Sequence, residues 1–170
     1  GCAGILHNAA ILPPVSEREP ALAERVNVVG TRVVAEVAAE LEAHLVFPSS
    51  VTVFGLSEPE EAPRRVGDPV VPTDVYTATK VRAEEVVRQV AATWTILRVG
   101  VSVSAHDRSV DPDTLGSMFE VGLDNRMEYV HPADVARAQV RALEVPEAAG
   151  RVLLIGGGEA CRITYRDLWK

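Results

Sequence analysis

The sequence lacks the features of membrane-spanning, secreted and disulfide-rich proteins. It has only two cysteines, Cys2 and Cys161, which are far apart and not part of a CxxC pattern, so neither a disulfide framework nor a zinc site is expected. No apolar run reaches the roughly 18 residues that a membrane span needs, and no secretory signal is visible. Basic residues form no cluster and the net charge is −7, which argues against a nucleic-acid or anionic-membrane surface. We therefore expect a globular, cytoplasmic protein without nucleic-acid or membrane partners.

The histidines show no spacing that would hold a metal ion. His7 and His131 lie beside apolar stretches, where a hydrogen-bonded structural histidine is the expected role. His44 and His106 are expected on the surface or in loops. Because no two histidines combine ligand spacing with a nearby carboxylate, no metal site is predicted.

Nearly continuous apolar runs alternate with helical patterns along the whole chain. Strands are predicted at 4–9, 44–50, 94–100, 127–131 and 151–158. Helices are predicted at 20–43, 75–92 and 132–145, with a short helix at 113–122 and a first helical turn at 164–170. Apolar strands that alternate with helices are typical of a parallel sheet covered on both faces. The sequence therefore predicts an α/β fold.

Two of the predicted helices have periodic apolar faces. The first, at 20–43, has an apolar stripe at three- and four-residue steps, formed by Val26, Val29, Val33, Val37 and Leu41. Ser16 with Glu19 resembles a capping box before it. In the second, at 75–92, apolar residues (Ala83, Val86, Val87, Val90) are set against polar ones (Arg82, Glu84, Glu85, Arg88).

A serine pair and a Tyr-x-x-x-Lys pattern are the candidates for chemistry. Ser49 and Ser50 end the predicted strand 44–50, and Tyr76 and Lys80 begin the following predicted helix. Ligands bind at the carboxyl ends of strands in such sheets. A nearby ammonium favours the phenolate, so Lys80 is expected to lower the pKa of Tyr76, while Ser50 orients a substrate oxygen. The alternative is an exposed helix pair and an ordinary strand-end hydroxyl.

The order of several short motifs resembles that of a known superfamily. The motifs are ILHNAA, NVVGT, HLVFPSSVTVFG, YTATK, ILRVG, EYVHPADVARA and RVLLIGGG. In this order they resemble the extended short-chain dehydrogenase/reductase superfamily and, within it, the NAD-dependent epimerase/dehydratase family. The resemblance covers essentially the whole chain. It implies a doubly wound, Rossmann-like parallel sheet and NAD or NADP as cofactor.

The resemblance also implies roles for single residues. Tyr76 resembles the catalytic acid/base, Lys80 the lysine that tunes it and holds the nicotinamide ribose, and Ser50 the hydroxyl that orients the substrate. Asn27 matches an asparagine on the preceding helix, or is simply a satisfied polar residue, and Asp134 matches an acidic residue that fixes structure. The implied cofactor contacts are Ala9, Ala10, Ser49, Tyr76, Lys80, Val99 and Val101.

The sequence also departs from the family pattern. Phe54 replaces a usual tyrosine, Pro48 precedes the serine pair, and VSVSAHD replaces the usual continuation after ILRVG, so the substrate class is open. The glycine-rich G-x-x-G-x-x-G turn that seats the cofactor pyrophosphate does not occur. We therefore interpret residues 1–170 as the C-terminal portion of one Rossmann-like domain, N-terminally incomplete, with a short substrate-region insertion near 101–127. By itself this portion is not expected to bind NAD(P) with useful affinity.

These observations lead to two hypotheses about function. The first is an NAD(P)-dependent oxidoreductase or epimerase/dehydratase that acts on a hydroxyl or carbonyl carbon of a small molecule, including a sugar nucleotide. The resemblance implies a homodimer in which the helices at 20–43 and 75–92 pair across a two-fold axis. The second is a non-catalytic relative, or an inactive fragment, with a binding or assembly role. The complete Ser50, Tyr76 and Lys80 set argues for the first, and the missing glycine-rich turn argues for the second.

Overall fold

The computed structural model describes residues 1–56, 63–102 and 122–168. Its strands are β1 (Gly4–Leu6), β2 (His44–Ser50), β3 (Thr93–Val99), β4 (Val101–Ser102), β5 (Arg126–Val130), β6 (Arg151–Ile155) and β7 (Arg162–Thr164). Its α-helices are α1 (Val15–Arg18), α2 (Pro20–Ala23), α3 (Thr31–Glu40), α4 (Val75–Val90), α6 (Pro132–Glu144) and α7 (Tyr165–Leu168). Further turns are the π-helix η1 (Glu24–Gly30) and the 3₁₀-helices η2 (Val51–Phe54), η3 (Pro146–Ala148) and η4 (Glu159–Cys161). None of the helices within these described ranges is long and apolar enough to cross a membrane.

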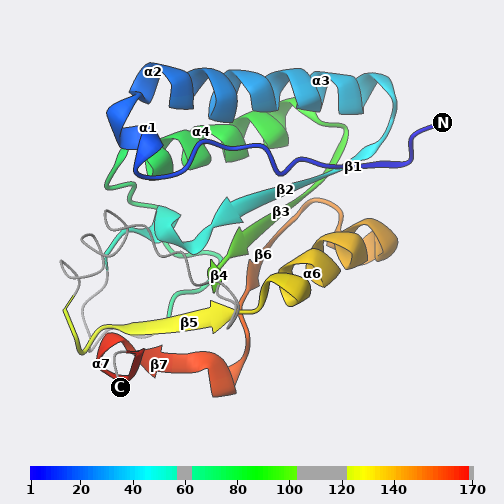
Figure 1. Ribbon diagram of the computed structural model, residues 1–170. Helices are drawn as coiled ribbons and strands as arrows, with labels where there is room; N and C mark the ends of the chain where they lie inside the picture. Colours follow the sequence, from blue (N-terminus) through cyan, green and yellow to red (C-terminus); the bar gives the residue numbers. More distant parts are fainter. Residues whose placement is uncertain (57–62, 103–121, 169–170) are drawn as a thin grey trace.

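The main sheet is parallel, with strand order β1-β2-β3-β6. Its register pairs Leu6 with Val46, and Ser50 with Val99. The strands carry few polar side chains because both faces of the sheet are covered, as the sequence predicted. The carboxyl ends of all four strands therefore point to the same side of the molecule (Figure 1).

Helices cover the two faces of the main sheet unequally. The segment α2–η1–α3 and helix α4 lie on one face, and α6 lies on the other (Figure 1). On the first face the core contains Leu45, Phe47 and Ile96, while Val46 and Leu97 pack toward α6. These residues alternate along β2 and β3 because neighbouring side chains on a strand point to opposite faces.

A small second sheet extends from the carboxyl ends of β3 and β6. In it β4 pairs parallel to β5, and β5 pairs antiparallel to β7, a strand that the sequence did not predict. Gly100 joins the two sheets: its N–H donates to Ile155 O at 2.8 Å, and a Cβ at this position would lie 2.8 Å from Glu128 O. Only glycine fits such a close backbone approach without displacement.

Several predicted elements are changed in detail. The helix predicted at 20–43 consists of α2, the π-helix η1 and α3, and it ends at Glu40. The prediction of a capping box at Ser16 and Glu19 was wrong. Helix α1 begins after Pro14 without a side-chain cap, and the Ser16 hydroxyl donates to Glu17 Oε1 at 2.9 Å. The helix predicted at 113–122 lies outside the described residues, apart from its last residue. The insertion near 101–127 is described only at its two ends, so the domain assignment stays a prediction.

The apolar stripe on the first long helix faces outward rather than into the core. Four residues of the stripe are 41–54% exposed: Val29, Val33, Val37 and Leu41. The buried positions on this segment are instead small or polar: Asn27, Thr31, Ala35 and Ala38. Small residues let η1 and α3 pack closely on the sheet and on α4, so the valine stripe is left at the surface.

Candidate active site

The predicted site residues gather at the carboxyl edge of the main sheet. Ser49 and Ser50 end β2, Val99 ends β3, and Ala9 and Ala10 follow β1. Register places Ser50 beside Val99, so these segments meet at one edge. Among the described residues no group of three or more His, Cys, Asp and Glu side chains could hold a metal ion.

Ser50 is held at the end of its strand by the turn that follows. It is the N-cap of η2, and its Oγ accepts a hydrogen bond from Thr52 N at 3.2 Å and lies 2.8 Å from Thr52 Oγ1. The capping geometry keeps the hydroxyl half-buried at the sheet edge. It also places Ser50 close enough to Tyr76 to lower the pKa of that phenol, against the larger effect of burial.

The start of α4 is fixed by two acidic side chains, and this fixes Tyr76. Asp74 and Thr77 form a capping box, in which Thr77 N donates to Asp74 Oδ1 at 2.7 Å and Asp74 N donates to Thr77 Oγ1 at 3.1 Å. From α1, Glu17 accepts hydrogen bonds from Val75 N and Tyr76 N, both at 3.1 Å. Carboxylates at a helix N-terminus satisfy free N–H groups and interact favourably with the helix dipole. Tyr76 therefore has a fixed backbone at the edge of the site.

Lys80 lies one helical turn after Tyr76 and is only 5% exposed. Its Nζ donates to Pro48 O at 2.8 Å and lies 4.7 Å from the centroid of the Phe47 ring and 5.9 Å from that of the Tyr76 ring. Burial lowers the pKa of Lys80 from 10.5 to about 8, and the charge of Glu84 opposes this change. Lys80 is thus a buried ammonium held against β2.

The expected lowering of the tyrosine pKa is not found. Burial, followed by the charge of Asp74, raises the pKa of Tyr76 to about 12, and the hydrogen bond with Ser50 acts in the opposite direction. The Lys80 ammonium donates to a backbone carbonyl rather than to the phenol, and a desolvated phenolate is unfavourable. Tyr76 is therefore a protonated phenol at neutral pH in this structure.

Asn27 links the segment after β1 to the helix that carries Tyr76. Its side chain accepts from Ile11 N at 2.7 Å and donates to Ile11 O at 3.0 Å and to Thr79 Oγ1 at 2.9 Å. Thr79 in turn donates to Tyr76 O at 2.8 Å. Asn27 is 2% exposed and lies in η1, so the interpretation as a satisfied polar residue is supported, and it also connects the two sides of the site.

The structure also brings in two residues that the sequence analysis did not select, Glu84 and Arg98. The Glu84 carboxylate accepts from Arg98 Nε at 3.0 Å and Arg98 Nη2 at 2.9 Å, and from Arg88 Nη2 at 2.7 Å. Although burial favours the neutral acid, the hydrogen bonds from Arg98 and the charges of Arg98 and Arg88 hold the pKa of Glu84 below its ordinary value. The available signal was spacing, since Tyr76, Lys80, Glu84 and Arg88 follow one another at four-residue steps.

The remaining singled-out residues have structural contacts. His7 lies 3.0 Å from Thr31 Oγ1 through its Nε2, and the Nδ1 of His131 accepts from Ala133 N at 3.1 Å as the cap of α6, as a structural histidine would. His44 begins β2 and is half-buried, with its Nε2 2.9 Å from Thr95 Oγ1, so it lies in a strand and not in a loop. Asp134 lies in the first turn of α6 and pairs with Arg137 at 2.8 Å. His106 lies outside the described residues.

The residues at this edge fit a nucleotide cofactor in size and in donor set. Ala9 is exposed, and Ala10, Val99 and Val101 are half-buried, so small side chains border the ends of β1 and β3. The Lys80 ammonium has several N–H donors, and within the described chain one of them is bonded to Pro48 O. A ribose hydroxyl is a suitable acceptor for another.

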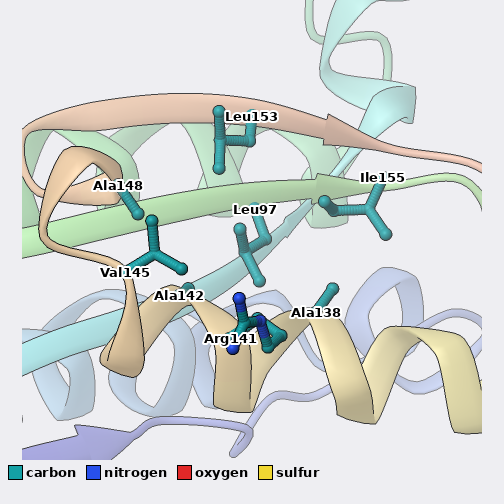
Figure 2. A pocket seen from close by; sticks show the side chains of 8 residues that line it. All are labelled: Leu97, Ala138, Arg141, Ala142, Val145, Ala148, Leu153 and Ile155. Atoms are coloured by element: carbon teal, nitrogen blue, oxygen red, sulfur yellow. The ribbon is translucent and has the colours of Figure 1, made fainter.

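The cavity in Figure 2 is a different feature of the molecule. It measures about 240 Å³ and lies between α6 and the strands β3 and β6, on the sheet face opposite α3 and α4. Apart from Arg141 its lining is apolar: Leu97, Ala138, Ala142, Val145, Ala148, Leu153 and Ile155. None of the predicted site residues lines it.

Comparison with known proteins places the chain in a family. A family model described as the RmlD substrate binding domain matches residues 3–126. The chain belongs to this family. UDP-glucose 4-epimerase 2 of Arabidopsis thaliana is 36% identical over 129 residues, which are 72% of this chain and 35% of that protein. Membership in the superfamily of NAD-dependent epimerases and dehydratases, which the motifs indicated, is thereby confirmed.

Solved structures show the same fold. A short-chain dehydrogenase/reductase superfamily protein from Agrobacterium tumefaciens with bound NAD matches with a TM-score of 0.79 and 24% identity, over 99% of this chain and 63% of that one. RMD from Pseudomonas aeruginosa, complexed with NADPH, matches with a TM-score of 0.79 and 18% identity, over 97% of this chain and 63% of that one. The Rossmann-like class of fold is confirmed. The chain spans about a third of the Arabidopsis protein and less than two thirds of either structure.

Proposed function

We propose that the protein is an NAD(P)-dependent oxidoreductase or epimerase/dehydratase that acts on a carbon bearing a hydroxyl or carbonyl group. The observation that carries this proposal is the meeting of Ser50, Tyr76 and Lys80 at the carboxyl edge of the parallel sheet. Ser50 acts on the pKa of Tyr76, and Lys80 lies on the same face of α4 as Tyr76 with its Nζ 5.9 Å from the centroid of the tyrosine ring. The edge is also where ligands bind in open α/β sheets.

In this proposal Tyr76 moves the proton and Ser50 orients the substrate oxygen. Because the pKa of Tyr76 is raised to about 12, its phenol is protonated at neutral pH and can donate to a carbonyl oxygen. The Ser50 hydroxyl, held by Thr52, donates a second hydrogen bond to that oxygen. A nicotinamide cofactor, when bound, supplies the hydride donor or acceptor. Lys80 holds the ribose of that cofactor and favours the phenolate when the reaction runs as an oxidation.

Sugar nucleotides are the substrate class that we favour. The support is the 36% identity to a protein named UDP-glucose 4-epimerase 2. The sheet of β4, β5 and β7 extends from the carboxyl ends of β3 and β6, and so from the edge that carries the site. A substrate held by that sheet would reach Ser50 and Tyr76.

We further propose a cytoplasmic homodimer. Its support is the outward-facing stripe of Val29, Val33, Val37 and Leu41, which is 41–54% exposed. Scattered surface valines need no explanation, but an aligned row on one helix marks a surface suited to association. A two-fold contact would pair α3 and α4 with the same helices of a second copy.

A second candidate function is a non-catalytic relative with a binding or assembly role. It is favoured by one observation: the pKa of Tyr76 is raised to about 12, and the Lys80 ammonium donates to Pro48 O rather than to the phenol. Such a protein would keep the fold and the Ser50, Tyr76 and Lys80 set without turnover. The two candidates differ in what happens after a cofactor and a substrate are added.

The test is turnover by the full-length protein with UDP-glucose and either NAD⁺ or NADP⁺, followed by NMR of the sugar and by absorbance of the reduced cofactor. We expect conversion of the sugar or reduction of the cofactor, and a loss of about 10²-fold or more in Ser50→Ala. Tight cofactor binding without conversion of any sugar nucleotide or carbonyl compound would favour the second candidate. Conversion that is unchanged in Ser50→Ala would contradict the proposed site.

A further inference from the structure

Helix α4 buries two charged residues within a row of polar ones. Tyr76, Lys80, Glu84 and Arg88 follow one another at four-residue steps, so they occupy one face of the helix on successive turns. Lys80 is 5% exposed and Glu84 is 1% exposed, whereas Tyr76 is half-buried and Arg88 is exposed. The candidate proton-moving pair is thus followed, one turn further along the same face, by a buried carboxylate.

The Glu84 carboxylate is held in one orientation by β3. Arg98 donates to both of its oxygens, at 3.0 and 2.9 Å, and Arg88 adds a bond of 2.7 Å. Arg98 is itself fixed, because its guanidinium lies 4.8 Å from the centroid of the Phe54 ring and donates to Val66 O at 3.3 Å. Bidentate arginine–carboxylate pairs are strong and directional, so Glu84 has little freedom to turn away from its row.

A buried ion pair is not needed to fill this part of the core. Apolar side chains of similar volume pack as well or better in many proteins, because taking two charges out of water carries a large desolvation cost. Besides these arginines and the buried Ser49, apolar residues lie nearby, with Ala83 and Val87 of the same helix in the adjacent core. A charge kept at this position therefore points to an electrostatic role for a neighbouring group.

We propose that Glu84 is a positioning residue for the candidate site: its buried carboxylate keeps the Lys80 ammonium charged, and Arg98 holds that carboxylate in place. The part that Lys80 plays in proton movement is the proposed function, and the functional meaning of this inference rests on it. The link between the two side chains rests on their burial one turn apart on the same face of α4, and the charge of Glu84 raises the pKa of Lys80 against the effect of burial.

The groups that surround Lys80 come from four parts of the chain: Tyr76 and Glu84 from α4, Phe47 and the Pro48 carbonyl from β2, His7 from the segment after β1, and Arg98 from β3 through Glu84. Burial, followed by the charge of Lys80, lowers the pKa of His7, so this histidine is neutral near pH 7. Tyr76 is likewise neutral there, because its pKa is raised. Glu84 is the group that opposes the loss of charge from Lys80.

The chain allows the charge of Lys80 to be measured directly, because its two lysines are Lys80 and Lys170. Protein labelled with ¹³C-lysine gives two side-chain signals, which Lys170→Arg assigns, and each is followed against pH. In the unmodified protein we expect a midpoint near 8 for Lys80. In Glu84→Gln the midpoint should fall by roughly one pH unit or more, since an opposite charge is lost and two arginines are left uncompensated.

Two variants that remove charges of opposite sign, Glu84→Gln and Arg98→Met, distinguish this role from a purely structural one by the direction in which the Lys80 midpoint moves. Arg98→Met leaves the Glu84 charge paired with Arg88 alone, so the Lys80 midpoint should rise, whereas Glu84→Gln should lower it. Loosening of the fold would move the midpoint upward in both variants, toward the value of a free lysine. The control is Glu85→Gln, an exposed carboxylate on the next residue of the same helix, which should leave the midpoint unchanged.

An unchanged or raised midpoint in folded Glu84→Gln would overturn the proposal. If Glu84→Gln alone does not fold, the comparison passes to Glu84→Gln/Arg98→Met against Arg98→Met, in which the same fall is expected and its absence is equally decisive. The measurement needs no substrate and no cofactor. A protein without turnover would contradict the proposed function while the lysine titration still decides this inference.

Discussion

Helices α3 and α4 pack side by side on the same face of the sheet, yet one exposes a row of apolar residues and the other buries two charged ones. Along α3 and the preceding π-helix the aligned valines Val29, Val33 and Val37 face outward. Along α4 the aligned polar residues Lys80 and Glu84 face inward. In both helices the row repeats every four residues, so periodicity defines a face in each case but not the side to which it turns.

This contrast separates two uses of a helix face. The buried row of α4 is satisfied within the chain, because Lys80 bonds Pro48 O and Glu84 bonds Arg98. The valine row of α3 has no comparable partner among the described residues and suits contact with another molecule. Substitutions on α4 are therefore expected to change the stability and ionisation of the interior. Substitutions on the valine row of α3 are expected to change association with a second copy.

The largest effect on stability is expected when Glu84 is truncated. Glu84→Ala leaves Arg98, which is 5% exposed, as a buried charge without its carboxylate. Breaking a buried pair in this way costs about 3–5 kcal/mol, which urea unfolding would measure. Glu85→Ala, one residue away and exposed, should stay within about 0.5 kcal/mol. Equal losses in the two variants would mean that the inner and outer faces of α4 do not differ.

The next effect is the pH dependence that Lys80 gives to stability. Burial lowers the pKa of Lys80 from 10.5 in the unfolded chain to about 8 in the folded one. Between these two pH values the unfolded chain binds more protons, so the contribution of Lys80 to stability rises with pH, by about 3 kcal/mol in total. Unfolding of the wild type and of Lys80→Met across this range should show the rise only in the wild type. If the unfolding free energy depended on pH in the same way in both proteins, the pKa of Lys80 would not be lowered by folding.

A smaller effect is expected at the start of α4. Asp74→Ala removes the acceptor of the Thr77 N–H, at 2.7 Å, and should lower the unfolding free energy by about 1 kcal/mol. The control is Asp134→Ala in the first turn of α6, whose exposed ion pair with Arg137 should contribute less than about 1 kcal/mol. A larger loss at Asp134 than at Asp74 would contradict the assignment of the cap.

The smallest effect on folding is expected on α3. Val33→Glu/Val37→Glu changes side chains that are 54% and 41% exposed, so the unfolding free energy of the monomer should shift by about 0.5 kcal/mol or less for each. Light scattering should nevertheless show that the proposed homodimer is lost. Ala35→Glu, on the buried face of the same helix, is the contrasting variant and should prevent folding. Severe destabilisation by the valine changes would mean that the stripe belongs to the core.

Much of the sheet could be predicted because its strands are continuous apolar runs. The strand at 44–50 was predicted with its observed bounds, while the three-residue β7 was missed because so short a segment has no periodicity. The outward direction of the valine stripe was not predicted, since spacing carries no information about which face small residues such as Ala35 allow to pack. Turn chemistry was also misassigned, because Ser16 bonds its neighbour Glu17 while the real capping box is at Asp74.

The candidate site was predicted from motifs, but its electrostatics were not. Ser50, Tyr76 and Lys80 meet at the edge where the motifs implied, whereas the pKa of Tyr76 is raised rather than lowered. That direction depends on burial and on the distance of the Lys80 ammonium, 5.9 Å from the ring centroid, which spacing along a helix does not give. Glu84 was named only as a polar residue of its helix, because its arginine partner Arg98 is 14 residues away in the sequence and the pairing is not visible there.

The most direct test of the central claim compares two tyrosines in the full-length protein. Tyr76→Phe removes the phenol beside Ser50, and Tyr165→Phe removes a phenol on α7. With a sugar nucleotide and NAD⁺ or NADP⁺, we predict that Tyr76→Phe lowers kcat by about 10²- to 10⁴-fold, the range for loss of a general acid/base. Tyr165→Phe should retain most of the activity. Undiminished turnover in Tyr76→Phe would contradict the account.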